Sequence, residues 1–278
     1  MPVIDCFPLY YAQRMGMFEA EGLDVRLQTY LSQMDCDTAL LNRRTEVALT
    51  DLPRLLEMQG DSTPLRAIMT TGGRLSLVTA KKARIRTLKH LNERMVALDR
   101  LTWADYWSDE LMKQAGLEQA AIYRPQINDI RLRTSMLTDQ LVDGAMLPEP
   151  YATQAEEKGH NRLYTTSDSA ISFTCLAISR QLLADKRRVA QVATLLRIYN
   201  KAVGQLNRQP NRDTLQAILV QDYQVPAEVA DTTWTFTPGR LPQESEAQTA
   251  YKWLRTRERR IRQSALDSLV SPRFFPSH

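Results

Sequence analysis

The stretch Pro8-Leu9-Tyr10-Tyr11-Ala12-Gln13-Arg14-Met15-Gly16-Met17-Phe18-Glu19-Ala20-Glu21-Gly22-Leu23-Asp24 decides the fold of this 278-residue chain. Its proline and Gly22 predict a helix over residues 9–20, because Pro is favoured in the first turn of a helix and Gly just beyond its end. Residues 24–30 then alternate between two kinds of side chain, with a period of two that predicts a strand with unlike faces. Residues 2–4 are taken as the end of an earlier strand, so the chain opens as strand, helix, strand.

The same alternation continues along the chain. Strands are predicted at residues 47–50, 65–70, 75–80, 95–98, 122–127, 144–147 and 174–179, and helices from about 37, after 51, and near 104–114, 130–141, 151–158 and 187–207. Strands that alternate with helices favour a parallel sheet with helices on both faces. We therefore predict an α/β protein of two lobes, each a mainly parallel sheet flanked by helices. Lobe I comprises residues 1–72 and 173–278 with a helical C-terminal region, and lobe II comprises residues 73–172.

The composition is that of an ordinary globular protein. Apolar residues make up 43% and charged residues 24% of the chain, and no apolar run approaches the ~20 residues of a membrane-spanning helix. The formal charge of +4 and the pI of about 9.0 raise the question of a nucleic-acid partner. The one dense basic run is Lys252, Arg255, Arg257, Arg259, Arg260 and Arg262. We interpret it as the solvated face of a helix, and expect no nucleic-acid partner.

The three cysteines, Cys6, Cys36 and Cys175, are too few for a disulfide framework and lack the paired spacing of a zinc site. No metal is expected. Cys6 and Cys36 follow the first two predicted strands, so a disulfide between them is geometrically possible if the strands are neighbours; the sequence leaves this open. Cys175 lies in a predicted strand, where a buried and inert thiol is the common outcome.

The opening stretch also resembles a known family. Residues 8–13, the pair Gly16 and Met17 with Phe18, and Glu-Gly-Leu-Asp-Val at 21–25 are similar to the start of the nitrate, sulfonate, taurine and thiamine-precursor (NMT1-like) solute-binding proteins of ABC importers. Residues 46–51 look like the third strand and its ligand loop, and residues 144–150 look like the acidic turn after a late strand of that family. The matches span most of the chain in the right order.

The resemblance implies a two-lobed type II periplasmic-binding-protein fold that closes on a small polar solute, with no catalysis and no cofactor. It implies a monomer that delivers its ligand to permease and ATPase subunits, and a periplasmic location or a lipoprotein anchor. In the family the first strand begins several residues before the position of Pro2. We therefore expect further residues, including an export signal, ahead of Met1.

Ligand loops are expected at the carboxyl ends of the strands, because ligands of open α/β sheets bind there. The candidate binding residues are Asp5, Cys6, Phe7, Tyr10, Met34, Asp35, Asp51, Thr71, Thr102, Trp103, Asn128 and Glu149. The carboxylates among them favour an amino-bearing ligand such as an aminopyrimidine or other thiamine precursor, and the aromatic rings could stack on it. Two plainer interpretations stay open: Thr102 caps a helix, and the aromatic residues are ordinary core.

Other functions are also compatible with parts of the pattern. Helix N-termini in the cleft would suit sulfonate, taurine or nitrate. A thiamine-pyrimidine synthase-like enzyme would need a histidine and a cysteine-rich segment, yet His90, His160 and His278 lie outside the predicted cleft loops. The sensor domain of a transcription regulator would need a helix-turn-helix ahead of it. For a binding protein, we expect closure about a hinge near residues 71–75 and 169–174.

Overall fold

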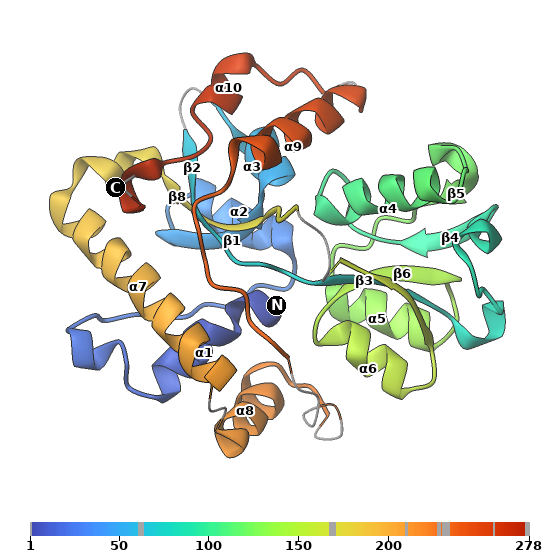
Figure 1. Cartoon of the computed structure of the whole chain (residues 1–278), viewed down its shortest axis with the longest axis horizontal. Coiled ribbons are helices and arrows are strands. Elements are labelled where there is room, and N and C mark those ends of the chain that lie inside the picture. Colours follow the sequence, from blue (N-terminus) through green and yellow to red (C-terminus); the bar gives the residue numbers. More distant parts are fainter. Residues whose placement is uncertain are drawn as a thin grey trace.

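The computed structural model describes residues 2–60, 64–166, 171–208, 211–226, 229, 234–257 and 259–275. It contains two sheets. The first has the order β1 (Val47–Asp51), β8 (Thr174–Ser179), β2 (Leu65–Thr70). The second has the order β5 (Ile122–Tyr123), β4 (Arg94–Ala97), β6 (Gly144–Pro148), β3 (Leu75–Thr79), β7 (Asn161–Thr165). Figure 1 shows the two sheets side by side, with helices around each.

The α/β class is as predicted, but the sheets are not mainly parallel: among the described residues the strand pairs of the first sheet are antiparallel, and the second sheet is mixed. β8 lies between β1 and β2 and is antiparallel to both. In the second sheet β4 is parallel to β5 and β6, but β3 is antiparallel to β6 and β7. The reason is that β8 returns from the second sheet and inserts between two strands that run the same way. Local sequence patterns carry no record of such a long-range pairing.

The alternation of strands and helices is confirmed. The helices are α1 (Phe7–Arg14), α2 (Gln33–Leu41), α3 (Leu52–Met58), α4 (Trp103–Gln114), α5 (Ile130–Thr138), α6 (Tyr151–Glu157), α7 (Lys186–Arg208), α8 (Arg212–Ala217), α9 (Glu244–Thr256) and α10 (Gln263–Asp267). Their starts follow simple capping chemistry: the side chains of Ser32, Asp51, Thr102 and Asp129 each accept a backbone N–H at the N-terminus of α2, α3, α4 and α5. No described helix is long and apolar enough to cross a membrane.

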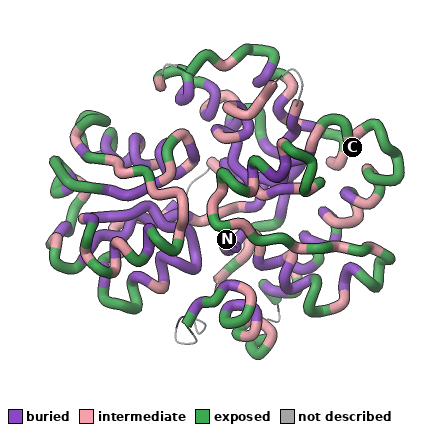
Figure 2. The backbone as a smooth tube through the Cα atoms, turned by 180° about the vertical axis from the view of Figure 1, so that it is seen from behind, coloured by how far each residue is buried: buried purple, intermediate pink, exposed green. Residues whose placement is uncertain are grey.

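Each sheet has its own packed core, and Figure 2 shows buried residues gathered in both halves of the molecule. On the first sheet, Cys175 and Ala177 of β8 pack with α2, α3 and α9. Leu176 and Ile178, the alternate residues of the same strand, pack with α7 on the opposite face. The apolar run of β8 therefore reflects a strand that is covered by helices on both faces.

The N-terminal region differs from the prediction in two places. Residues 4–6 form a 3₁₀ turn rather than the end of a strand. Residues 24–30 are extended but are not assigned to a strand, although Val25 and Leu27 are more buried than their polar neighbours. Gly22 stops the preceding turn in the left-handed region at φ 69°, as expected of a glycine at this place.

Two connections between the sheets run beside each other. The backbone N–H of Thr71 donates to the carbonyl of Thr174 at 3.0 Å, and the N–H of Gly73 donates to the Thr174 hydroxyl at 2.8 Å. A Cβ on Gly73 would lie 2.6 Å from an Asp5 carboxylate oxygen and 2.7 Å from the Thr174 side chain, so only glycine fits there. The predicted hinge includes residues 71–75 and 171–174 of these connections, while residues 169 and 170 lie outside the described residues.

Candidate functional site

The two sheets meet at a junction built from helix starts. Asp51 ends β1 and caps α3, where its carboxylate accepts the N–H of Arg54 at 2.9 Å. The other carboxylate oxygen accepts the N–H of Trp103, the first residue of α4, at 3.3 Å. Thr102 caps α4 by accepting the N–H of Ala104 at 3.1 Å, so the capping interpretation of Thr102 is confirmed. Burial, aided by Asp37 and Asp99, raises the pKa of Asp51 to about 8.

Charged side chains that the sequence did not single out surround Asp51. Arg54 forms an ion pair with buried Asp37 at 2.7 Å. Asp37 also accepts the side-chain amide of Gln33 at 2.9 Å. From the second sheet, Asp99 forms an ion pair with Arg133 at 3.0 Å. Asp37 and Asp99 are thus paired with arginines, whereas the hydrogen bonds described for Asp51 come from backbone N–H groups. The sequence contains one indication of this arrangement: Arg54 lies three residues after Asp51, the N-cap residue that accepts its backbone N–H.

A second contact between the sheets involves α2 and the start of α5. The side-chain amide of Asn128 donates to the sulfur of Met34 at 3.1 Å, and Ser32 pairs with Asp129 in an isolated antiparallel bridge. Asp35 is exposed and belongs to a capping box, in which its carboxylate accepts the N–H of Ser32 at 3.2 Å. The structure thus brings Met34 and Asn128 together, while the Asp35 carboxylate caps the start of α2.

The remaining predicted residues lie in internal contacts. Asp5 is buried and accepts the hydroxyl of Thr71 at 2.6 Å, and burial raises its pKa. Glu149 is buried, forms an ion pair with Arg162 and accepts the N–H of Thr153 at 3.1 Å. Phe7 is 1% exposed and belongs to a hydrophobic cluster, so for this ring the core interpretation holds. The structure does not gather Asp5, Glu149 and Asp35 into one acidic cleft.

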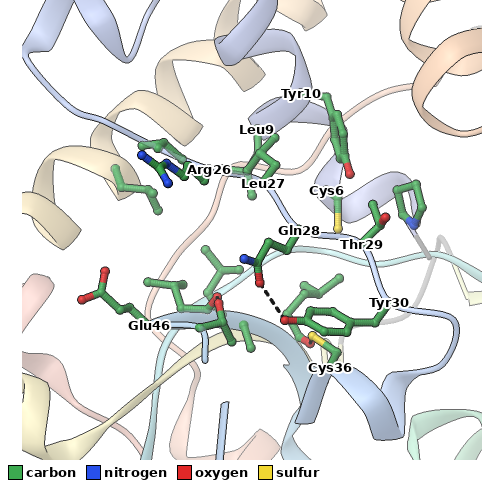
Figure 3. Close-up of a pocket in the computed structure, with 18 of the residues that line it drawn as sticks. Cys6, Leu9, Tyr10, Arg26, Leu27, Gln28, Thr29, Tyr30, Cys36 and Glu46 are labelled. Carbon is green, nitrogen blue, oxygen red and sulfur yellow. Dashed lines mark hydrogen bonds between the residues drawn. The ribbon is translucent and has the colours of Figure 1, made fainter. Parts of the chain in front are cut away.

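A cavity of about 260 Å³ begins beside this junction and extends along β1 (Figure 3). Its lining includes Cys6, Tyr10, residues 23–30, Ser32, Gln33, Cys36, residues 45–49 and, from α7, Arg188, Gln191, Val192 and Leu195. Of the twelve predicted binding residues, Cys6 and Tyr10 line it. Both Cys6 and Cys36 are free thiols. Burial raises the pKa of Cys6 to about 11 and that of Cys36 to about 12.

The basic run near the C-terminus is only partly a solvated helical face. α9 ends at Thr256, and Arg257 beyond it is half-buried and forms ion pairs with Asp105 and Asp109 of α4. Arg259 pairs with Glu57 at 2.6 Å. These two arginines are partnered by carboxylates because the chain folds back against α3 and α4, which a local pattern cannot show.

The family is decided by the comparison with known sequences. A family model described as NMT1/THI5 like matches residues 4–213. The chain belongs to the NMT1/THI5-like family. A search of curated proteins finds no match.

Solved structures show which proteins share this fold. The periplasmic aliphatic sulphonate binding protein SsuA from Escherichia coli is 16% identical, with 98% of this chain and 96% of that chain covered and a TM-score of 0.78. The periplasmic nitrate-binding protein NrtA from Synechocystis is 13% identical, with 98% and 85% covered and a TM-score of 0.80. The desulfurization enzyme DSZB is 13% identical, with 96% and 94% covered and a TM-score of 0.66. The NMT1/THI5-like chain therefore has the periplasmic-binding-protein fold, as predicted.

Proposed function

We propose that this NMT1/THI5-like chain is the solute-binding component of an ABC importer and holds a small polar solute at the junction of its two sheets. The observation that carries the proposal is the hydrogen bond from Trp103 to Asp51, because it joins the start of a second-sheet helix to the end of a first-sheet strand. Ligands of open α/β sheets bind outside the carboxyl ends of strands, and β1 and β4 both end near this point. The sulphonate- and nitrate-binding neighbours support the same function.

The mechanism we propose is closure of one lobe on the other. Lobe I comprises residues 1–72 and 173–278 and lobe II residues 73–172, joined by the paired connections at Thr71 and Thr174. The direct contacts of Met34 with Asn128 and of Ser32 with Asp129 are those of a closed state. A solute that binds between the lobes favours closure by its greater affinity for the closed state. The closed protein, acting as a monomer outside the cytoplasmic membrane, would then deliver its solute to permease and ATPase subunits.

The contacts at the junction favour an anionic solute over an amine. The starts of α3 and α4 meet at the Asp51 to Trp103 contact, and the starts of α2 and α5 meet at the Ser32 to Asp129 bridge. The N-termini thus meet in two pairs, and helix N-termini present partial positive charge, part of which the capping side chains of Asp51 and Asp129 already offset. The carboxylates of Asp5 and Glu149 suggested an amine ligand, but Asp5 accepts the Thr71 hydroxyl and Glu149 is ion-paired with Arg162. We propose a small sulfonate or a similar oxyanion, with an aminopyrimidine as the second candidate because the carboxyl of Asp51 remains at the junction.

The experiment is a thermal-shift and calorimetric titration with taurine, alkanesulfonates, nitrate and aminopyrimidines. A ligand that binds only the folded state raises the Tm. Asp51→Ala, which removes the acceptor of the Trp103 N–H, should weaken binding of the active compound at least tenfold, whereas Trp107→Ala on α4 should leave its Kd within about twofold. A shift with aminopyrimidines alone would replace the oxyanion by the second candidate. Absence of binding by every compound would contradict the proposed function.

A further inference from the structure

Residues 81–94, which connect β3 to β4, form a second basic run besides the one near the C-terminus. They hold six Lys and Arg residues and a single carboxylate, Glu93. All six basic residues are exposed: Lys81, Lys82, Arg84, Arg86, Lys89 and Arg94. Arg94 pairs with Asp143 at 3.4 Å, and within the described part of the chain the other five form no ion pair. A run of like charges is most often a solvated face, so its backbone, position and neighbours decide whether it does more.

The backbone of this run is anchored to the second sheet. Ile85 is 2% exposed and Leu91 is fully buried, and both belong to the hydrophobic core of that sheet. The backbone N–H of Lys82 donates to the side chain of Gln140 at 3.2 Å. The apolar residues of the run therefore point into the core, and its cations are displayed to solvent from a fixed backbone.

The run lies at the end of the second sheet that is opposite the junction. β4 begins at Arg94 and leads to Thr102, the cap of α4, so β4 ends at the junction and starts at the other end. The last residue of β3, Thr79, is paired with Gly144, the first residue of β6, and β6 is parallel to β4. β3 therefore ends where β4 starts. Figure 1 shows the connection between them on the side of the second sheet that faces away from the first sheet.

Exposed apolar side chains lie beside these cations. Met95 is 43%, Tyr123 62% and Leu141 61% exposed. Met95 and Tyr123 are paired across β4 and β5, and Leu141 follows Gln140, which binds the backbone of Lys82. We call these three residues and the six cations of residues 81–94 the outer face. Cations mixed with exposed apolar and aromatic side chains suit the boundary between lipid headgroups and acyl chains.

A hollow opens between the cations of the outer face. Its lining includes Lys82, Arg84, Lys89 and Arg94 together with two carboxylates, Asp139 and Asp143. Asp143 is already paired with Arg94, so the lining has an excess of positive charge. Each of the lining cations is exposed, and a site for one small anion would instead be expected to bury a cation. The charge is spread over a face, which matches an extended anionic surface.

We propose that the outer face docks on the surface of a bilayer that contains anionic lipids. The cations are attracted to the lipid phosphates, and this attraction falls off within a Debye length of ~10 Å. Tyr123 and Leu141 enter the headgroup region, where aromatic and apolar side chains are favoured. Because the outer face is opposite the junction, docking leaves the junction uncovered. The docking surface is an addition to the proposed function and does not depend on which solute the protein holds.

The test measures co-sedimentation of the purified protein with vesicles in the absence of any solute, so its outcome is independent of the proposed transport function. Vesicles of equal parts phosphatidylglycerol and phosphatidylcholine are compared with vesicles of phosphatidylcholine alone at ~0.1 M salt. The variant Arg86→Gln/Lys89→Gln removes two cations of the outer face. The matched control Lys201→Gln/Lys252→Gln removes two exposed cations of α7 and α9 in lobe I, so the two variants have the same net charge.

We expect the protein to bind the anionic vesicles and not the neutral ones. Binding of the outer-face variant should be weaker by about 25-fold, because each Lys or Arg near an anionic surface contributes about fivefold, and the control should bind within about twofold of the wild type. Leu141→Ser, which leaves the charge unchanged, should weaken binding about fivefold. Absence of binding, equal binding to both kinds of vesicle, or an equal loss in the two double variants would overturn the proposal.

Three further results would show that another anion, and not a bilayer, fits the outer face. Stronger retention of the protein by polyglutamate or by duplex DNA than by anionic vesicles would show an anionic polymer and would overturn the proposal. Release from the vesicles by millimolar inorganic phosphate at constant ionic strength would show a small-anion site in the hollow and would overturn it too. Unchanged binding of Leu141→Ser would mean that charge alone holds the protein, which contradicts insertion into the headgroup region.

Discussion

The carboxylate of Asp51 accepts the backbone N–H of Trp103 at 3.3 Å, while its other oxygen accepts the N–H of Arg54 at 2.9 Å. One side chain thus caps α3 in the first sheet and touches the start of α4 beside the second. The residue is 3% exposed, and burial raises its pKa to about 8. The protonation of Asp51 therefore affects the contact between the two sheets.

We predict that Asp51→Asn becomes more stable relative to the wild type as the pH rises from 4 to 8. The folded-state pKa of about 8 exceeds the value of about 3.9 for an unfolded chain. The folded state then holds a proton that the unfolded state loses, so the wild type loses stability with rising pH across this window. Asparagine cannot ionise and still caps α3. Urea unfolding should show the difference growing by up to about 1.4 kcal/mol per pH unit.

Asp35→Asn is the matched control, because Asp35 is an exposed residue in the capping box of α2. It should change the free energy of unfolding by no more than about 0.5 kcal/mol. If Asp51→Asn gave a constant difference from pH 4 to pH 8, Asp51 would be ionised in the folded protein and the argument from burial would fail.

We predict that Glu149→Ala damages folding rather than ligand recognition. Glu149 is buried, pairs with Arg162 and accepts both the N–H of Thr153 at 3.1 Å and its hydroxyl at 2.8 Å. Without Glu149, Arg162 keeps only its ion pair with Glu156 at 2.9 Å among the described residues, and two hydrogen bonds from Thr153 lose their acceptor, so the loss should be about 2–3 kcal/mol. Chemical denaturation should show this loss. Glu157→Ala, an exposed position at the end of the same helix α6, should change the stability by less than about 0.5 kcal/mol.

The sequence predicted the local features of this fold and missed those that depend on distant partners. Gly22 and the cap at Thr102 follow rules that act within one turn, and the structure has both. The insertion of β8 between β1 and β2 depends on a pairing across more than a hundred residues. Residues 24–30 show how far a pattern reaches: their period of two predicts extended backbone correctly, but a strand also needs a neighbour to bond to.

The candidate site divides in the same way. Asp51 and Trp103 were predicted because loops at strand ends hold ligands, and the structure brings them together. Asp5 and Glu149 follow the same rule, yet Thr71 and Arg162 occupy their carboxylates. Those partners lie on other elements. A sequence pattern states that a carboxylate stands near a strand end, but only the packing decides which way it faces.

We predict that Arg257→Ala loosens the contact between α4 and α9. Arg257 forms ion pairs with Asp105 and Asp109. Arg124 pairs with Asp109 at 2.9 Å, and the indole N–H of Trp253 donates to Asp109 at 2.7 Å. With two buried carboxylates left to one arginine, the protein should lose about 3–5 kcal/mol.

Lys252→Ala tests the specificity of that loss, because Lys252 is an exposed basic residue of α9, the helix that ends just before Arg257. It should change the stability by no more than about 0.5 kcal/mol. Equal effects of the two substitutions in denaturant unfolding would mean that general charge, and not the cluster at Asp105 and Asp109, sets the stability of this contact.

The thiols of Cys6 and Cys36 provide a last prediction, on reactivity. Both line the cavity beside β1, and burial raises their pKa values to about 11 and about 12. An unperturbed thiol has a pKa of about 8.5, so at pH 8 the thiolate fraction should be lower than in the unfolded chain by roughly two orders of magnitude or more. Iodoacetamide should therefore alkylate both residues very slowly in the native protein and rapidly in urea.

The pH dependence separates thiol ionisation from access. If ionisation limits the rate, native alkylation should rise about tenfold per pH unit from pH 7 to pH 9, because each unit multiplies the small thiolate fraction tenfold. A rate that stayed flat over this range would mean that opening of the cavity is limiting. Cys6→Ser and Cys36→Ser assign the two rates, and Cys175, fully buried in β8, should stay unmodified until the protein unfolds.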